Sequence, residues 1–291
     1  MKGIILAGGS GTRLNPATIS ISKHMIPVYD KPMIFYPLST LMLAEINEIL
    51  IISSPAHLDS YKNLLGDGTN YGISIEYLIQ DKPNGIAEAF IIAENFIGQD
   101  DVCLILGDNI FYGEHFSSKL INAQKKLKGA SIFAYWVNNP YDFGVIEFNK
   151  KGKPKKIVEK PKKPISNYAI TGIYLYKNSV INFAKKLKPS NRNELEITDL
   201  NNIYLRNKTL DVNIFGRGFA WLDTGTPDSL LEASQFVRTV EKRQGLKIAC
   251  LEEIALKNKW LKPSDLKKRM KGTKDNKYFN YLKELLSSTQ K

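Results

Sequence analysis

The N-terminal segment, residues 2–27, constrains this chain more than any other stretch; it reads KGIILAGGSGTRLNPATISISKHMIP. It begins with an apolar run that is typical of a buried parallel strand. Three glycines follow this run: Gly8, Gly9 and Gly11. Because glycine has no Cβ atom, such a loop can turn sharply and bring its backbone N–H groups to an anion. Two cations, Arg13 and Lys23, come soon after, so the segment predicts a polyphosphate-binding site.

The spacing of the glycines excludes two common phosphate-binding motifs. A dinucleotide-binding G-x-G-x-x-G needs a glycine three positions after Gly11, where Leu14 stands. A P-loop needs a lysine and a hydroxyl residue after its last glycine, whereas Thr12 and Arg13 follow Gly11. Taken alone, the stretch could also be a tight strand-to-helix turn with incidental charges.

Apolar runs alternate with helical patterns along the first half of the chain. Strands are expected at residues 48–53, 73–79 and 101–106, and helices at residues 33–46, 59–65 and 85–97. This alternation indicates an α/β fold with a doubly wound, mainly parallel, Rossmann-like sheet. Ligands of such sheets bind beyond the carboxyl ends of the strands. We therefore expect the glycine loop, Gln80 and Asp108 to share one crevice.

From residue 130 onward short strand patterns predict an inserted small β region. Its expected strands are residues 131–137, 144–148, 156–159, 170–176, 210–215 and 220–222, with helices at residues 183–187 and at ELEITDLNNIYL. We assign residues 1–228 to an α/β core. Residues 229–291 are expected to form a helical C-terminal region that packs on the core, although the pattern leaves a small separate subdomain open.

The net charge of +12 does not by itself predict nucleic-acid binding. Residues 241–291 hold fourteen Lys/Arg and six Asp/Glu, a balance of +8. No nucleic-acid motif or aromatic interleaving accompanies this excess, which is typical of solvated helix faces. We expect no nucleic-acid partner. A basic nucleic-acid-binding module is the least favoured alternative, and salt-sensitive DNA binding would be its mark.

Membrane segments and disulfides are not expected either. No apolar run reaches the length of a membrane span, and the chain opens on a strand pattern rather than a signal peptide. Cys103 and Cys250 stand far apart in apolar surroundings, which indicates buried thiols. We therefore expect a cytoplasmic protein without a membrane partner.

Two aspartates follow predicted strands, Asp108 in ILGDNIF and Asp223 in AWLDTGTP. Each one alone is typical of a turn or a helix cap. Together, beside a phosphate loop, they can supply the one or two carboxylates through which Mg²⁺ binds a nucleotide.

Several motifs resemble the signature of sugar-1-phosphate nucleotidylyltransferases, and the chain is especially similar to the short glucose-1-phosphate thymidylyltransferases. They are GGSGTRL, SKHMIP, DKPMI, ELEITDLN, GRGFAWLDTGTPDSLLEASQFV and RQGLKIACLEEIA, and they span nearly the whole chain. The resemblance implies Mg²⁺-dependent transfer of a thymidylyl group from dTTP to glucose 1-phosphate. The products are dTDP-glucose and pyrophosphate, in the first step of dTDP-sugar synthesis of the dTDP-rhamnose type.

The same resemblance implies a role for each matching residue. The nucleotide-binding residues are Gly8, Gly9, Gly11, Thr12, Arg13, Lys23, Gln80, Pro83, Gly85 and Asp108, and they belong to a nucleotide-binding part at about 1–129. The sugar-binding residues are Gly144, Glu159, Lys160, Ile170 and Tyr174, in a sugar-binding part at about 130–228. The implied metal ligands are Asp108 and Asp223, and the implied catalytic cations are Arg13, Lys23 and Lys160.

The implied reaction needs no general base. A sugar 1-phosphate is an ionised nucleophile near neutral pH, because the second pKa of a phosphate monoester is about 6. The site has only to neutralise charge and to hold the reacting atoms in line. Arg13 would bind the triphosphate and the departing pyrophosphate, and Lys23 would contact the phosphates at the reacting centre. Each contact would be worth about 3 kcal/mol in a dry site.

Three positions depart from the family pattern: His24, Asn15 and Asn193 stand where relatives commonly have glutamine, an aromatic residue and glycine. None of them is a proposed metal or phosphate ligand. Two alternatives stay open: a uridylyltransferase acting on UTP, since thymine and uracil differ by one methyl group, and a non-catalytic sugar-nucleotide sensor. The resemblance also implies a homotetramer with feedback by a dTDP-sugar, at a site lined by residues 112–116, Arg217 and Gly218.

Overall fold

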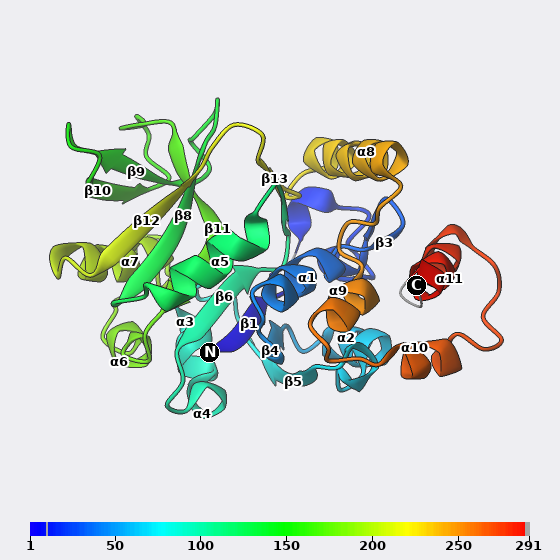
Figure 1. Ribbon diagram of the computed structural model, residues 1–291. Helices are drawn as coiled ribbons and strands as arrows, with labels where there is room; N and C mark the ends of the chain where they lie inside the picture. The colour runs from blue at the N-terminus through cyan, green and yellow to red at the C-terminus, as the bar shows by residue number, and fades with distance from the viewer. Residues whose placement is uncertain (10, 289–291) are drawn as a thin grey trace.

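The computed structural model describes residues 1–9 and 11–288. Ser10 of the glycine loop and the end of the expected helical region, residues 289–291, lie outside the described residues. Within the described chain a nine-stranded sheet forms the centre of the molecule, with helices on both of its faces (Figure 1). Its strands are β1 (Lys2–Leu6), β4 (Glu48–Ser53), β5 (Ser74–Ile79), β6 (Val102–Leu106), β8 (Ala130–Trp136), β9 (Gly144–Phe148), β10 (Pro154–Glu159), β11 (Tyr168–Tyr176) and β12 (Leu210–Phe215).

The strand order is β10-β9-β11-β6-β1-β4-β5, and β8 and β12 extend the sheet from β11. The four strands β6, β1, β4 and β5 are parallel, and Ile4 of β1 lies opposite Leu50 of β4 and Leu104 of β6. The pairs of β11 with β6, β8 and β9 are antiparallel, as is β9 with β10, whereas β12 runs parallel to β8. The expected doubly wound α/β sheet is confirmed.

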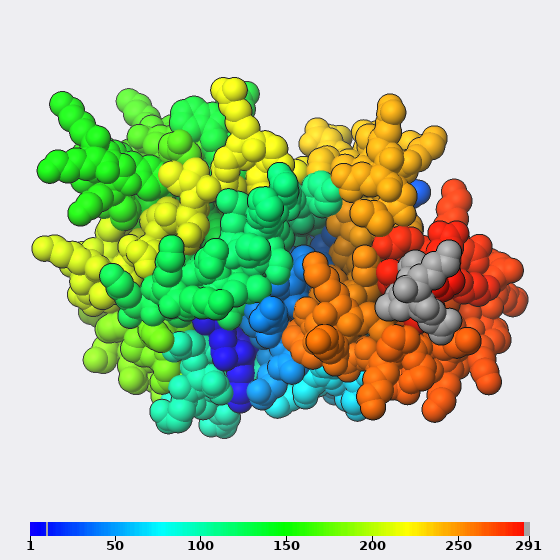
Figure 2. Space-filling model, viewed as in Figure 1, coloured from blue at the N-terminus to red at the C-terminus, as the bar shows by residue number. Residues whose placement is uncertain are grey.

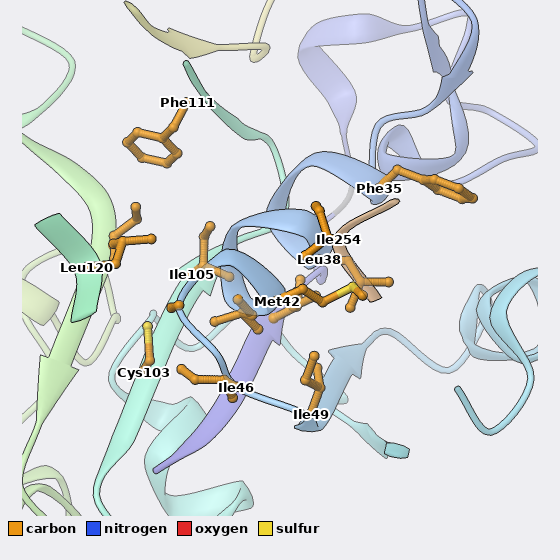
Figure 3. Close-up of a cluster of buried hydrophobic side chains, with 14 of the residues drawn as sticks. Phe35, Leu38, Met42, Ile46, Ile49, Cys103, Ile105, Phe111, Leu120 and Ile254 are labelled. Atoms are coloured by element: carbon orange, nitrogen blue, oxygen red, sulfur yellow. The ribbon is translucent and has the colours of Figure 1, made fainter. Parts of the chain in front are cut away.

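Side chains of the parallel strands alternate between two hydrophobic clusters, one on each face of the sheet. On β1, Ile5 belongs to the first cluster and Ile4 to the second, as period-2 alternation requires. Figure 3 shows part of the first cluster, where Leu38 and Met42 lie near Ile105 of the sheet and Ile254. Because both faces are covered, the strands read as continuous apolar runs.

The helices that cover the sheet belong to these two clusters. The first face carries α1 (Phe35–Leu43), α2 (Leu58–Leu65), α5 (Phe116–Lys125) and α9 (Leu251–Lys257), and the second carries α3 (Glu88–Ile92), α4 (Glu94–Ile97), α6 (Val180–Ala184) and α7 (Ile197–Arg206). Two small sheets, β2 (Pro27–Val28) with β3 (Lys31–Pro32) and β7 (Asn109–Tyr112) with β13 (Ala220–Asp223), complete the strands. Short 3₁₀ turns are η1 (Thr12–Leu14), η2 (Lys23–Met25) and η3 (Thr69–Tyr71).

Two helical expectations need correction. The single helix expected at residues 85–97 is two helices, because the backbone leaves helical geometry at Ala93 (φ −85°, ψ 6°), which ends α3 and begins α4. The helix expected at residues 183–187 is α6, which begins three residues earlier. Asp101 anchors the preceding turn by accepting from the Lys177 ammonium at 2.8 Å and from the Asn178 backbone N–H at 3.2 Å.

Residues 227–288 are mainly helical, as expected, and contain α8 (Pro227–Gln244), α9, α10 (Pro263–Arg269) and α11 (Lys277–Ser288). Thr226 caps α8, with Pro227 in its first turn and a reciprocal bond to Ser229. Helices α10 and α11 lie at the end of the molecule opposite β9 and β10 (Figures 1 and 2). The division of the chain at residue 228 stays a prediction. None of the described helices combines the length and the apolarity that crossing a membrane requires.

Candidate functional site

The glycine loop leaves the carboxyl end of β1 and turns through two left-handed residues. Gly9 has φ +99° and Gly11 has φ +59°, a region that side chains other than glycine rarely adopt. Gly11 caps η1, and its carbonyl accepts a hydrogen bond from the Thr18 hydroxyl at 2.8 Å. This hydrogen bond fixes the end of the glycine loop, directly before η1 and Arg13.

Lys23 and Asp108 form an ion pair at the carboxyl ends of the strands. Lys23 begins η2, and its ammonium donates to Oδ2 of Asp108, just beyond the end of β6. Asn109 Nδ2 donates to the other oxygen of Asp108 at 2.9 Å. The side-chain Oδ1 of Asn109 in turn accepts from Trp221 Nε1–H at 2.6 Å and from the Gly172 backbone N–H at 3.0 Å. Burial alone would favour the neutral acid, but Lys23 and these bonds lower the pKa of Asp108 to about 2.

Asp223 reaches the same place through β13. In the antiparallel pair of β13 with β7, Asp223 lies opposite Asn109, so the two aspartates are neighbours although they are far apart in sequence. The next residue, Thr224, is fully buried and donates to the Asp108 backbone oxygen from both its hydroxyl (2.8 Å) and its N–H (3.2 Å). Burial and the nearby Asp108 carboxylate raise the pKa of Asp223 to about 6.

The aspartate pair fits a divalent cation that phosphate oxygens help to bind. Lys23 pairs with Asp108, whereas burial first and then the Asp108 charge raise the pKa of Asp223, so a cation bound beside the two carboxylates would favour the ionised form of Asp223. Among residues 1–9 and 11–288, no group of three or more acidic, histidine or cysteine side chains could hold a metal alone. Two carboxylates with substrate phosphates and water are the ligands that Mg²⁺ commonly takes.

A pocket of about 200 Å³ extends from the aspartate pair into the β region. Its lining brings together every residue expected on the sugar side with Arg13 and both aspartates: Arg13, Asp108, Gly144, Glu159, Lys160, Ile170, Tyr174 and Asp223. Arg13 lies close to Gly225, where a Cβ would be 3.0 Å from the guanidinium Nη2. The left-handed conformation of Lys160 (φ +36°) changes the chain direction at the end of β10.

The carboxylate of Glu159 belongs to a hydrogen-bonded network from α7 and the loop before it. Thr198 donates to its Oε2, and Arg192 approaches its Oε1 at 3.4 Å. Arg192 is itself held by Glu196, at 2.7 Å and 3.0 Å, and also pairs with Glu194 at 3.3 Å. Burial is the largest cause that raises the pKa of Glu159, and the nearby Glu196 charge raises it further. The hydrogen bond from Thr198 and the charge of Arg192 act in the opposite direction, but the net shift is upward.

A second pocket lies on the other side of Asp108, along the glycine loop. Most residues expected to bind the nucleotide line it: Gly8, Gly9, Lys23, Gln80, Pro83, Gly85 and Asp108. Asp108 therefore belongs to both pockets. Gly11 and Thr12 line neither pocket, and their place in the fold is to turn the loop into η1. The crevice expected to join the glycine loop, Gln80 and Asp108 is present.

Two backbone hydrogen bonds made by Leu195, which we call the Leu195 strap, connect the segment at residues 84–87 with the loop at residues 190–196. The Leu195 N–H donates to the Asn84 carbonyl at 2.6 Å, and the Ala87 N–H donates to the Leu195 carbonyl at 3.2 Å. Gly85 is pressed against the same residue, and a Cβ there would lie 2.5 Å from the Leu195 backbone. The loop that carries Arg192 is thus fastened to the segment that follows Gln80.

The three departures from the family pattern are accommodated by the local structure. His24 is buried with its ring against Gly107, its Nδ1 lies 3.0 Å from the Tyr61 hydroxyl, and burial lowers its pKa to about 3. The side-chain amide of Asn15 lies within hydrogen-bonding distance, 2.8 Å, of the Thr18 hydroxyl oxygen. Asn193 has φ +60°, a left-handed conformation that asparagine tolerates better than most side chains.

One residue of the segment suggested for a feedback site, Phe116, contacts the residue that follows Gly218. The segment 112–116 reaches the turn that carries Arg217 and Gly218 through the rings of Phe116 and Phe219, whose centroids are 5.2 Å apart. A regulatory role for this contact stays a prediction.

The sequence did not identify Thr224, Thr198 or Arg192 as residues of the site. Each stands beside a residue or inside a motif that was recognised, since Thr224 follows Asp223 and Thr198 lies in ELEITDLN. Closeness to a recognised residue or motif was the only sign in the sequence that these threonines could belong to the site. Their partners, the Asp108 backbone and the Glu159 carboxylate, are distant in sequence.

Comparisons with known proteins agree with this geometry. The family model for nucleotidyl transferases matches residues 2–240. A glucose-1-phosphate thymidylyltransferase of Neisseria meningitidis is 57% identical over 286 residues, which is 98% of this chain and 99% of that protein.

Solved structures show the same fold. A Bacillus anthracis protein described as a glucose-1-phosphate thymidylyltransferase and crystallised with sucrose is 42% identical, with a TM-score of 0.76, over 82% of this chain and 95% of that one. A UDP-glucose pyrophosphorylase in complex with UDP-glucose has a TM-score of 0.72 over 82% of this chain and 98% of its own. At 24% identity, that second likeness concerns the fold alone.

Proposed function

This chain belongs to the nucleotidyl transferase family and, within it, to the glucose-1-phosphate thymidylyltransferases, and we propose that it transfers a thymidylyl group from dTTP to α-D-glucose 1-phosphate. The products are dTDP-glucose and pyrophosphate, and they begin synthesis of dTDP-sugars of the dTDP-rhamnose type. The observation that carries this proposal is one crevice with two pockets that share Asp108. The two substrates would meet at that shared residue.

The residues of the first pocket suit a sugar phosphate. Glu159 can accept hydrogen bonds from sugar hydroxyls, because Thr198 and Arg192 hold its carboxylate in place. Lys160, the next residue, supplies a cation for the sugar phosphate. Gly144 leaves room for the ring, since a Cβ there would lie 3.2 Å from Glu159 Oε2. Ile170 and Tyr174 complete the apolar wall.

The residues of the second pocket suit a nucleoside triphosphate. The N–H groups at Gly8 and Gly9 face a phosphate, with Gly11 and Thr12 turning the loop behind them. Gln80, Pro83 and Gly85 form the base end of the pocket. Arg13 and Lys23 neutralise the triphosphate and the charge that develops on the departing pyrophosphate. No side chain has to remove a proton, because the sugar phosphate is already ionised.

Nucleotidyl transferases require a divalent metal, and we assign Mg²⁺ to Asp108 and Asp223. When bound, the ion withdraws negative charge from the phosphates at the reacting centre. Thr224 keeps Asp108 and Asp223 side by side, and Lys23 holds the Asp108 carboxylate ionised.

A matrix of nucleotides and sugars tests this function. Four triphosphates (dTTP, UTP, dCTP and dATP) are combined with several sugar 1-phosphates and Mg²⁺, and pyrophosphate release is measured. We expect dTTP with glucose 1-phosphate to give the highest kcat/KM. Greater turnover of UTP would reassign the enzyme to uridylyl transfer, and an absence of pyrophosphate from every pair would favour a non-catalytic sensor.

We further propose that the protein works in the cytoplasm as a homotetramer, with feedback by a dTDP-sugar at segment 112–116, Arg217 and Gly218. The mass in solution by light scattering tests the tetramer. Titration with dTDP-rhamnose at fixed dTTP tests the feedback. Purely competitive inhibition against dTTP would contradict a separate regulatory site.

A further inference from the structure

Asn109, the residue after Asp108, is buried at the start of β7, with a side chain and backbone that are together only 2% exposed. Its side-chain oxygen Oδ1 accepts from Trp221 Nε1–H at 2.6 Å and from the Gly172 backbone N–H at 3.0 Å. An indole N–H and a backbone N–H can only donate, so the amide oxygen has to face them. The orientation of the Asn109 amide is therefore fixed by β13 and β11.

With its oxygen held in this way, Asn109 turns its NH₂ group to the carboxylate of Asp108. Its Nδ2 donates to Asp108 Oδ1 at 2.9 Å, while the Lys23 ammonium donates to Oδ2. In the pairing of β7 with β13, Asn109 also lies opposite Asp223. One amide thus contacts the first aspartate and stands across the strand pair from the second.

Trp221 connects this amide to the wall of the first pocket. Its ring lines that pocket and packs on Phe143, with ring centroids 5.0 Å apart, while its N–H is used by Asn109. Gly172 comes equally close, because a Cβ there would lie 2.6 Å from Asn109 Oδ1. Within residues 1–9 and 11–288, Asn109 has no buried side-chain atom without a hydrogen-bond partner, and a fully paired network of this kind is rigid.

From these contacts we propose that Asn109 is a positioning residue for the cation site: it holds the Asp108 carboxylate in the orientation that binds a divalent cation, and Trp221 in turn holds Asn109. The wall of the sugar pocket and the metal ligand are then joined through one amide. The inference rests on the proposed function, in which Asp108 and Asp223 bind Mg²⁺ together with the nucleotide. Residues that hydrogen-bond a ligating carboxylate commonly contribute about 10- to 100-fold to metal affinity.

Three substitutions perturb this network in different ways. Asn109→Ala removes the amide itself, and with it the bond to Asp108. Trp221→Phe keeps an aromatic wall but has no N–H, so one of the two donors to Asn109 is lost. Gly172→Ala leaves every hydrogen-bonding group in place and adds a methyl group that displaces the amide.

Two further substitutions are matched controls. Asn201 is a fully buried asparagine of α7 that accepts from the Tyr176 hydroxyl, so Asn201→Ala reproduces the general cost of losing a buried amide. Phe143→Leu reshapes the pocket wall beside Trp221 and leaves the hydrogen bonds of Asn109 in place.

Mn²⁺ is the probe, and its binding to the protein with dTTP present and without a sugar phosphate is measured by electron paramagnetic resonance, relative to dTTP alone. We expect Asn109→Ala to raise the Mn²⁺ dissociation constant at least about tenfold. Trp221→Phe and Gly172→Ala should raise it by a smaller factor, about threefold. Asn201→Ala should leave it unchanged, and Phe143→Leu should change only the KM for glucose 1-phosphate.

The role of Asn109 is overturned if Asn109→Ala binds Mn²⁺ as tightly as the unmodified protein, or if Asn201→Ala weakens Mn²⁺ binding by the same factor. If Asn109→Ala does not fold by circular dichroism, Trp221→Phe and Gly172→Ala decide by the same constant. The proposed transfer reaction is judged apart from this, on pyrophosphate release from dTTP and glucose 1-phosphate by the unmodified protein.

Discussion

The hydroxyl of Thr224 donates a 2.8 Å hydrogen bond to the backbone oxygen of Asp108, and this bond joins the two strand ends that carry the proposed metal ligands. Because Thr224 directly follows Asp223, this bond fixes the backbone of Asp223 beside the backbone of Asp108. The antiparallel pairing of β13 with β7 also keeps Asp223 opposite Asn109, the residue after Asp108. The aspartate pair is therefore built into the fold before any ligand arrives.

Removing the charge of Asp223 should be costly for the chemical step. We expect Asp223→Asn to lower kcat at least about 100-fold, which corresponds to roughly 3 kcal/mol of lost transition-state stabilisation. The measurement is pyrophosphate release at saturating substrates over a range of Mg²⁺ concentrations. Asp211→Asn, an exposed change on β12, serves as the control. Unchanged turnover of Asp223→Asn at saturating Mg²⁺ would reject Asp223 as a ligand.

Thr224→Val keeps the shape of the side chain and removes its hydroxyl. The buried carbonyl of Asp108 would retain only the Thr224 N–H, so we expect the free energy of unfolding to fall by about 1 kcal/mol. The Mg²⁺ concentration for half-maximal activity should rise, because Asp108 and Asp223 are held less firmly. Urea unfolding and a Mg²⁺ titration measure these effects, with exposed Thr239→Val on α8 as the matched control. Identical Mg²⁺ curves for the two variants would contradict the positioning role.

Glu159→Gln tests the sugar side of the crevice. The amide keeps the length of the side chain, but it loses the charge that attracts hydroxyl hydrogens and the Arg192 guanidinium. We expect the KM for glucose 1-phosphate to rise about tenfold, while the KM for dTTP changes little. Steady-state kinetics with each substrate varied in turn make the comparison, and Glu147→Gln on the neighbouring strand is the control. Equal increases in both KM values would argue against a sugar-specific contact.

A buried charge cluster ties α8 to the turn between β2 and β3 and predicts an acid-sensitive contribution to stability. Glu241 accepts from Lys31 at 3.0 Å and from Lys247 at 2.7 Å, and both lysines also pair with Asp30. Burial raises the pKa of Asp30, but its two lysine partners bring it below the ordinary value of 3.8. A pKa that is lower in the folded state stabilises the protein above pH 3.8, and this contribution is lost as the pH falls through the folded value.

The variant Asp30→Asn should therefore lower the free energy of unfolding at pH 7, and its difference from the unmodified protein should shrink below pH 3.8. Urea unfolding at a series of pH values checks this. The exposed Asp59→Asn should show a smaller difference at every pH, because exposed ion pairs contribute little. A constant difference for Asp30→Asn from pH 7 to pH 3 would exclude the ion-paired cluster as its cause.

Prediction from the sequence succeeded where the signal is local. The apolar run at residues 48–53 is β4 to the residue, because a strand covered on both faces needs no information beyond its own composition. The start of α6 was wrong because Asp101, far away in the chain, fixes the turn before it. The antiparallel pairing of β11 was likewise not expected, since pairing depends on which strands meet and not on the run itself.

The site shows the same division. Glycines, cations and aspartates at strand ends were identified by their position after apolar runs, and the structure brings most of them to one crevice. Thr224 was missed because a threonine after an aspartate carries no signal of its own until β13 pairs with β7.

The strap from Leu195 to Asn84 and Ala87 has a consequence for how such an enzyme can diversify. A substitution that reshapes the base end of the crevice shifts the Asn84 carbonyl, and through Leu195 it also displaces the guanidinium of Arg192 three residues earlier. Laboratory evolution toward a new nucleobase should therefore accumulate compensating changes in the loop at residues 190–196, even when the sugar partner is kept the same.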